Sequence, residues 1–397
     1  MQNRKRMPNE ISDFLRERID AGDFPSAVYL VAEKGEIVLQ DAVGNAVVDP
    51  EPIKAETDTI YDLASITKPL VTGLLCAALL EKGEIGIDDP ISKYFDKFKT
   101  AEKENVSLKQ LLTHTSGFKA WLPFYLVPNQ PVVEANGQMG HCDPEITRFV
   151  VNEISRRPLA VSAGSWVTYS DLNFILLGRL VEELNGQSLA GILVTEYFSK
   201  LGLFRTFYGG AETLRREIAA SEKGNGFEKQ TCLELGFLSP EAAELKSAGF
   251  REDVIWGEVH DGNAWYMGGV AGHAGLFSTA EEVFKIAQQF LPNYSTLLKA
   301  ETCELFHTNF THGMNEHRSF SFQLASTPES AAGTMMSPQS YGHLGFTGTS
   351  LWIDPVKERV FILLTNRTHN HPLPFVNLNS VRRRFHDLAI GQLERNS

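Results

Sequence analysis

The stretch from Tyr61 to Gly83 constrains the fold most, because it holds a long apolar run with a lysine at its start. After Lys68, only Thr72 interrupts about a dozen apolar or small residues, so we predict a helix that is apolar on all sides and buried between layers. Pro69 is tolerated near a helix start, and the glycine at position 83 is typical of a helix end. A lysine on such a helix needs a partner or a chemical role, since an unpaired ammonium is costly to bury.

Ser65 and Lys68 are one helical turn apart and therefore share a face at the start of this predicted helix. A desolvated lysine has a lowered pKa and can take the proton of a neighbouring serine. The helix N-terminus offers N–H groups to an oxyanion. The spacing alone is a weak signal, because Ser116 and Lys119 repeat it; no apolar helix follows that second match, and we interpret it as chance. The alternative for Lys68 is a lysine that reaches solvent from a helix end.

Size, charge and cysteine spacing limit the class of protein. With 397 residues and 43% hydrophobic content, the chain can bury one large core or two packed ones. A net charge of -12 argues against nucleic acid and against an anionic membrane as partners. No apolar run approaches membrane-spanning length, and none follows the basic N-terminus, so we expect a cytoplasmic protein. The oligomeric state is not indicated. The cysteines lack zinc or redox spacing and are expected to be reduced; they are Cys76, Cys142, Cys232 and Cys303.

Strand patterns occur at both ends of the chain and helical patterns lie between them. We therefore predict an α/β (α+β) fold. An antiparallel sheet is built from residues 1–90 and 315–397 and flanked by helices, and a mostly helical domain, residues 91–314, is inserted. Residues 208–265 are charged and loop-rich. The predicted strands are residues 27–32, 37–43, 351–353 and 359–365, and the predicted helices include residues 9–21, 145–154, 172–184, 188–198 and 279–291, with a last helix carrying Val381, Phe385, Leu388 and Ala389 on one stripe.

Two further stretches could complete a site around Ser65. In the first, Tyr169 and Asp171 lie where a loop enters an apolar helix, and a tyrosine beside a lysine cation can act as a base. The alternative is a packing tyrosine and a helix-capping aspartate. In the second, glycines alternate along a strand around His343 and Gly345, which indicates close approach of a ligand to an edge strand with a free N–H. The alternative is a bulged edge with a structural histidine.

The motifs Ser65-x-x-Lys68, Tyr169-Ser-Asp171 and His343-x-Gly345 occur in the order and rough spacing of a known family. The chain resembles the β-lactamase-related serine hydrolases, which include class C β-lactamases, D-alanyl-D-alanine carboxypeptidases, D-aminopeptidases and family VIII carboxylesterases. The resemblance covers nearly the whole chain. It implies the serine β-lactamase/penicillin-binding-protein-like fold.

The resemblance also implies roles for single residues. Ser65 is then the acylated nucleophile, and Lys68 and Tyr169 activate first the serine and then the water. The backbone N–H groups of Ser65 and Phe346 form the oxyanion hole, while His343 and Gly345 line the substrate channel. It implies no cofactor.

The sequence departs from the lactamases of this family at two positions: Asp171 stands where they have asparagine, and His343 stands where they have lysine. Asp171 can instead pair with Lys68, keep it protonated and leave Tyr169 as the base. We therefore expect a serine hydrolase for small esters or amides, with carboxylesterase activity favoured. A D-amino-acid peptidase or β-lactamase is the alternative within enzymes. A catalytically silent binding or scaffold protein is the alternative outside them.

Other candidates receive structural interpretations. We expect His260 and His273 to be structural or to support the site from behind. The alternating pair at His369 and His371 is expected to lie in a loop and to bind no metal. An aromatic group can line an acyl pocket or simply pack in the core; it comprises Trp121, Phe124 and Tyr125.

Overall fold

The computed structural model describes residues 9–131, 140, 143–244 and 249–396. Its main element is a seven-stranded antiparallel sheet in the order β3-β2-β1-β10-β9-β8-β7. Strands from the two ends of the chain meet at its centre, where β1 pairs with β10, so the predicted fold is confirmed. The strands are β1 (Ser26–Glu33), β2 (Glu36–Val47), β3 (Ile53–Lys54), β7 (Gln323–Leu324), β8 (Tyr341–Leu344), β9 (Ser350–Asp354) and β10 (Arg359–Thr365).

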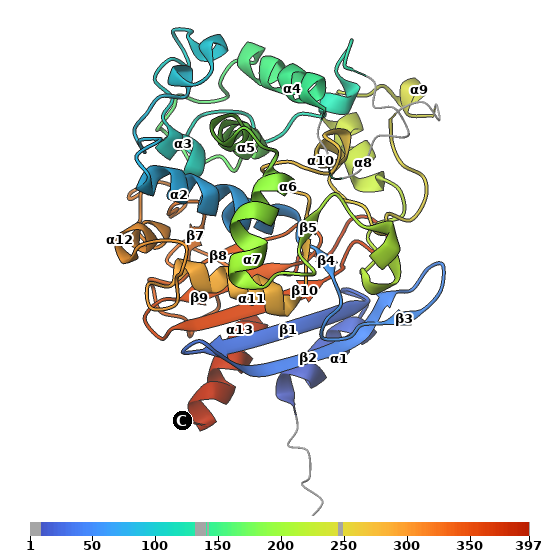
Figure 1. The fold of residues 1–397 in the computed structure, drawn as a ribbon. Coiled ribbons are helices and arrows are strands. Elements are labelled where there is room, and N and C mark those ends of the chain that lie inside the picture. The colour runs from blue at the N-terminus through green and yellow to red at the C-terminus, as the bar shows by residue number, and fades with distance from the viewer. Residues whose placement is uncertain (1–8, 132–139, 141–142, 245–248, 397) are drawn as a thin grey trace, which may run out of the picture.

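Both faces of the sheet are covered, which the alternation of β1 shows. Tyr29 and Val31 pack into one core together with helices α1 (Glu10–Asp20) and α13 (Asn379–Asn396). Val28 and Leu30 point the other way, into the larger core shared with the helical part of the chain. Figure 1 shows α1 and α13 below the sheet and the remaining helices above it. The predicted apolar stripe of the last helix is confirmed by these contacts.

The turn between β1 and β2 joins the first two predicted strands as a hairpin. Lys34 and Gly35 have φ values of +50° and +82°. Two successive left-handed residues match the twist of the flanking strands, as in a type I′ turn. The second predicted pair of strands, around Asp354, is confirmed as β9 and β10.

Most predicted helices occur within a few residues of their expected bounds, but the described part of residues 208–265 contains helices that the sequence did not predict, among them α8 (Gly226–Glu234) and α9 (Pro240–Ala243). In α8 the only buried side chains are Glu228 and Cys232, so the helix has no apolar stripe to reveal it. The α-helices that the structure describes within residues 91–314 are α3 (Leu108–Leu112), α4 (Pro144–Arg156), α5 (Asp171–Asn185), α6 (Leu189–Ile192), α7 (Ser199–Leu201), α8 (Gly226–Glu234), α9 (Pro240–Ala243), α10 (Gly262–Tyr266), α11 (Ala280–Ala287) and α12 (Ala300–Cys303).

The apolar run after Ser65 is a continuous helical segment, but it is not a regular α-helix throughout. It begins as a 3-10 turn over Ala64–Ile66, continues as a π-helix over Lys68–Gly73 and ends as α2, Leu74–Glu81. By length and composition alone, Ala64–Glu81 could cross a membrane, so the expectation that no apolar run approaches that length is wrong. However, 78% of it is buried inside the protein, so its apolar character is that of a core helix.

A small second sheet positions the start of this helix. It has the order β4-β6-β5, with β4 at Tyr61–Asp62, β5 at Phe207–Tyr208 and β6 at Leu276–Ser278. Helix α11 packs against β1 and β10 although it lies within residues 91–314. The division of the chain at residues 90 and 315 therefore stays a prediction.

Candidate active site

Ser65 sits at a strained turn between β4 and the core helix. Ala64, just before it, has a φ of +47°, which is uncommon for a residue with a side chain. The buried carboxylate of Asp62 holds this turn by accepting hydrogen bonds from the backbone N–H groups of Ala64 and His260, both at 2.8 Å. Burial raises the pKa of Asp62. The turn is thus fixed by a residue that the sequence analysis overlooked, although it lies three positions before the serine.

Lys68 is fully buried and makes three polar contacts that fix its ammonium beside the serine. Its Nζ donates to Ser65 Oγ at 2.9 Å and to the carbonyl of His273 at 3.0 Å, and it pairs with Asp171 Oδ1 at 2.7 Å. Burial disfavours the charge, but Asp171 and then Tyr169 oppose this effect, so the pKa of Lys68 is raised. The expected pairing of Asp171 with Lys68 is present, and the lysine is a cation at rest.

Tyr169 lies between two cations. Lys68 Nζ is 4.9 Å from its ring centroid, and the Arg318 guanidinium carbon is 5.5 Å from it. Its buried hydroxyl has no hydrogen-bond partner among the described residues. Burial raises the pKa of Tyr169 more than the attraction of Lys68 lowers it. Tyr169 is therefore a neutral phenol at rest. Arg318 belongs to no motif, and nothing in the sequence signals its place here.

Two buried histidines pack against the Tyr169 ring, with centroid separations of 4.5 Å for His114 and 5.8 Å for His343. His114 Nδ1 accepts from the backbone N–H of Ser170, and His343 Nδ1 donates to the carbonyl of Leu344, both at 3.0 Å. Burial, reinforced by the charges of Lys68 and Arg318, holds the pKa of both imidazoles well below its usual value. Both rings are thus neutral, and neither adds a fixed charge to the site.

A cavity of about 750 Å³ opens above these groups. Ser65, Tyr169 and Asp171 lie on its wall, and so do Gly345 and Phe346. His343 is not part of this wall. It is buried and packs against the Tyr169 ring, a position that differs from the one we expected in the wall of the substrate channel. The remaining wall contains aromatic side chains, carboxyl groups and two guanidiniums; these residues include Trp121, Phe227, Phe375, Glu228, Asp261, Arg367 and Arg382.

The carboxyl groups on this wall are held by separate partners. Glu228 accepts from the Tyr125 hydroxyl at 2.6 Å and from the Gly262 N–H at 2.8 Å, and burial raises its pKa. Asp261 pairs with His273 Nε2 at 3.0 Å, and this partner keeps its pKa low in spite of burial. The carbonyl of His273 accepts from Lys68. His273 therefore supports the site from behind, as expected.

The turn after β8 brings a backbone N–H to the cavity. Strand β7 pairs only with Tyr341 and Gly342, so β8 is unpaired on that side from His343 onward. A Cβ on Gly345 would lie 2.6 Å from the Leu63 carbonyl, so only glycine allows this approach to the Ser65 segment. The N–H of Phe346 has no acceptor among the residues that the structure describes. The expected free N–H is therefore present, although β8 is the penultimate strand and not the edge.

Several other candidates lie away from the reacting groups. Ser116 is buried and donates to Asn173 at 2.6 Å, which agrees with our interpretation of the second motif as chance. His369 accepts from the Val48 N–H at 2.9 Å and is structural. No group of three or more potential ligands among the described residues could hold a metal ion. Three of the cysteines, Cys76, Cys232 and Cys303, are buried free thiols, and Cys142 lies outside the described residues.

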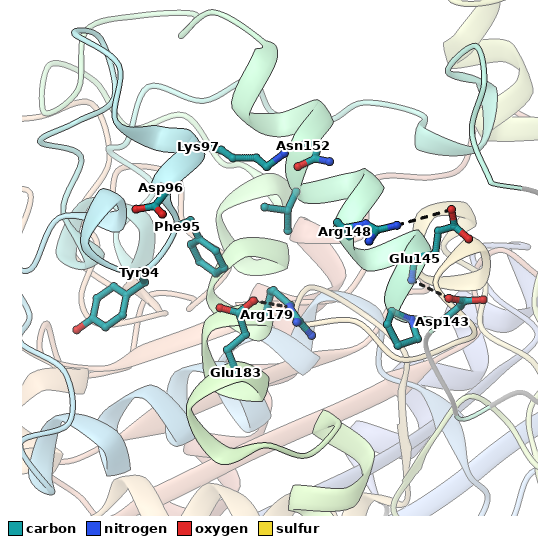
Figure 2. Close-up of a pocket in the computed structure, with 12 residues that line it drawn as sticks. Tyr94, Phe95, Asp96, Lys97, Asp143, Glu145, Arg148, Asn152, Arg179 and Glu183 are labelled. Carbon is teal, nitrogen blue, oxygen red and sulfur yellow. Dashed lines mark hydrogen bonds and ion pairs between the residues drawn. The ribbon is translucent and has the colours of Figure 1, made fainter.

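A second cavity, of about 690 Å³, lies in the helical part of the chain between residues 94–97, α4 and α5. Figure 2 shows that charged side chains dominate its wall, with Arg148 paired to Glu145 and Arg179 paired to Glu183. Among the described residues, its lining contains no serine, cysteine or histidine. We call it the α4 groove.

Comparison with known proteins identifies the chain. The Beta-lactamase family matches residues 11–382, which is nearly the whole protein. This chain belongs to the Beta-lactamase family. It is a serine hydrolase by that membership, and the motifs of Ser65, Lys68 and Tyr169 lie in the matched region.

Proteins similar to this Beta-lactamase family member carry names that refer to different activities. A "Putative D-alanyl-D-alanine carboxypeptidase" of Escherichia coli K12 is 32% identical, over 91% of this chain and 82% of its own length. The solved structure of "EstCE1, a hydrolase with promiscuous acyltransferase activity" has a TM-score of 0.69 at 17% identity, with coverage of 95% and 97%. A class C β-lactamase structure has a TM-score of 0.68 at 15% identity, with coverage of 96% and 94%. The two structures show a shared fold, and the range of names leaves the substrate open.

Proposed function

We propose that this serine hydrolase forms an acyl-enzyme on Ser65 and cleaves small carboxylic esters. One observation carries the proposal: the Ser65 hydroxyl contacts Lys68, whose ammonium also pairs with Asp171, at the wall of a cavity with aromatic sides. A serine hydroxyl is a weak nucleophile until a neighbouring group takes its proton. The three side chains supply the nucleophile and a route for that proton.

The charge state at rest defines this route. Lys68 is a cation and must release a proton before it can accept one from Ser65. In our proposal, Ser65 Oγ bonds to the substrate carbonyl carbon while Lys68 takes the hydroxyl proton and passes one to Asp171. The neutral Tyr169 hydroxyl gives its proton to the departing alkoxide. The resulting tyrosinate, next to cationic Lys68, takes a proton from the water that hydrolyses the acyl-enzyme. The Asp171 proton then returns to Ser65 through Lys68.

Negative charge on the substrate oxygen needs donors during both steps. The Phe346 N–H is free to serve as one donor, and by family resemblance the Ser65 N–H is the other. Fixed donors aimed at a developing oxyanion are often the largest single contribution to catalysis.

The walls of the cavity favour an uncharged, apolar substrate. Phe346 packs against Phe227 and Phe375, with ring centroids 4.7 and 5.9 Å away, and forms an aromatic surface next to the oxyanion donor. His343 is neutral, so it offers no fixed charge to a substrate carboxylate where lactamases of the family have lysine. Both features support an ester with apolar substituents.

A D-amino-acid carboxypeptidase is the second candidate, and a specific feature favours it. Arg367 and Arg382 lie on the cavity wall, and neither has an ion-pair partner in the described ranges. Unpaired guanidiniums suit a substrate carboxylate. The name of the E. coli relative points the same way.

The test is a comparison of kcat/KM for an aryl butyrate, a chromogenic cephalosporin and a D-alanine anilide. We expect the butyrate to be cleaved best. If the anilide or the cephalosporin exceeds it by about tenfold, equivalent to about 1.4 kcal/mol in transition-state stabilisation, the ester assignment is wrong. Mass spectrometry after reaction with a fluorophosphonate should place the adduct on Ser65.

A further inference from the structure

Two buried arginines lie behind the turn that carries the Phe346 N–H. Arg382, on α13, donates from Nη2 to the carbonyls of Gly345 and Thr349 at 3.2 and 3.1 Å. Arg367 donates from Nε to the carbonyl of Phe346 at 2.7 Å. The backbone of this turn is therefore held by guanidiniums on its carbonyl side.

Burying these two guanidinium groups costs free energy, which indicates that their contacts with the turn have a function. Neither guanidinium has a carboxylate partner in the described part of the chain. Burial lowers the pKa of Arg382 to about 9 and that of Arg367 to about 10. An uncompensated buried charge is destabilising. An apolar residue or a glutamine could fill the same space behind the turn without that cost.

The geometry of one peptide group links Arg382 to the site. In a trans peptide, the carbonyl and the N–H point in opposite directions. Because Arg382 and the Gly348 N–H both hold the Gly345 carbonyl, the N–H of Phe346 is turned away from the guanidinium, and this N–H has no acceptor among the described residues. Two hydroxyls fix the same turn to the serine segment: Thr347 donates to the Asp62 carbonyl at 2.7 Å, and Thr349 donates to the Leu63 carbonyl at 3.0 Å.

A cation on the carbonyl oxygen also changes the electronics of the peptide. Hydrogen bonds in a chain polarise one another, and a charged donor makes the strongest of them. The guanidinium draws electron density toward the Gly345 oxygen. The Phe346 N–H on the other end of that peptide thereby becomes a stronger donor.

We propose that Arg382 is a positioning residue of the oxyanion hole, which orients and polarises the Gly345–Phe346 peptide so that its N–H stabilises the oxyanion formed at Ser65. This inference rests on the proposed acyl-enzyme mechanism. It differs from the use of Arg382 as a carboxylate-binding group, because it requires no charge on the substrate.

The experiment compares Arg382→Gln and Arg382→Lys with Arg383→Gln, a matched control on the next residue of the same helix whose partner is the exposed Glu329. The substrate is an aryl butyrate, which carries no carboxylate. An alkyl boronic acid, which forms a tetrahedral adduct with the serine, reports on the oxyanion hole. Complete removal of one oxyanion donor costs about a hundredfold to a thousandfold in kcat, so a misaligned donor should cost less.

We expect Arg382→Gln to lower kcat about tenfold or more with little change in KM, and to weaken boronic acid binding by the same factor. Arg382→Lys keeps the charge but not the fork of donors and should show an intermediate loss. Arg383→Gln should match the wild type in both measurements. If Arg382→Gln does not fold, the test is whether Arg382→Lys loses kcat and boronic acid affinity by the same factor.

Three results would overturn the proposal. One is a wild-type kcat in a folded Arg382 variant. Another is a loss of kcat without a matching loss of boronic acid affinity. The third is a loss confined to substrates that carry a carboxylate, which would make Arg382 a direct binding group. Failure of the acyl-enzyme mechanism itself is distinguishable, because the wild type would then form no fluorophosphonate adduct on Ser65.

Discussion

The Ser65 cavity and the α4 groove have similar volumes, about 750 and 690 Å³, but opposite chemistry. Around the cavity, polar groups are buried and their pKa values are shifted: the pKa of Lys68 is raised, and that of His343, behind the wall, is held well below its usual value. In the groove, the charges are exposed and paired mostly within their own helices, such as Arg148 with Glu145.

Volume alone therefore does not make an active site. Burying a polar group is expensive unless it is paired, so a cluster of buried polar groups with free N–H or O–H bonds needs a function to explain it. Exposed intrahelical ion pairs contribute little and are ordinary surface features. Substitutions in the two regions test this contrast, with the α4 groove as the internal control.

The largest effect is expected for Ser65→Ala. Loss of the nucleophile should lower kcat by as much as about a millionfold and abolish the fluorophosphonate adduct, while the protein stays folded. Ser116→Ala is the matched control, because that serine has the same Ser-x-x-Lys spacing but hydrogen bonds to Asn173. Steady-state hydrolysis and circular dichroism measure both variants. A folded Ser65→Ala protein with normal turnover would remove the contrast between the two cavities.

Lys68→Ala and Tyr169→Phe should each lower the single-turnover acylation rate by about a hundredfold to ten-thousandfold, which is the usual range for an acid–base group. Because both act in one linked series of proton transfers, the double variant should lose much less than the product of the single losses. Multiplicative losses in this cycle would show that the two side chains act independently. Arg179→Gln in the α4 groove should leave acylation unchanged.

Acid should destabilise the protein through its buried imidazoles. The pKa of His343 is depressed in the folded state, so its contribution to stability is complete above the unfolded pKa of about 6.5 and is lost as pH falls below it. Between pH 7 and 5, this one group should reduce the free energy of unfolding by up to about 2 kcal/mol. Urea unfolding at both pH values should show a smaller decrease in His343→Gln. An unchanged decrease would mean that His343 is protonated in the folded protein.

The smallest effect is expected in the groove. The double variant Glu145→Gln and Arg148→Gln removes an exposed pair 3.8 Å apart and should change the free energy of unfolding by less than about 1 kcal/mol. Its kcat/KM for the aryl butyrate should equal that of the wild type. A clear loss of hydrolysis would show that the groove communicates with Ser65 and would contradict our separation of the two regions.

Sequence patterns predicted the sheet and most helices because these elements have a periodic apolar face or, in the Ser65 segment, are apolar on all sides. The Ser65 segment, the β1–β2 hairpin and the stripe of α13 are all visible in this way. Helix α8 was not predicted, because it buries Glu228 and Cys232 and has no apolar stripe. The 3-10 and π geometry around Ser65 was not predicted either, since it depends on contacts with distant residues, such as the hydrogen bond from the Thr72 hydroxyl to the Gly272 carbonyl.

The order and spacing of the motifs that carry Ser65, Lys68, Tyr169 and Asp171 were enough to predict the family and the fold, and spacing along one helix places Ser65 and Lys68 on one face. The protonation of these side chains and the groups that hold them could be read only from the folded protein. Arg318 and Arg382 reach the site from segments more than 200 residues away along the chain from Ser65, and no local pattern marks them. Burial and the charge of neighbours set a pKa, and both arise only when distant segments pack together.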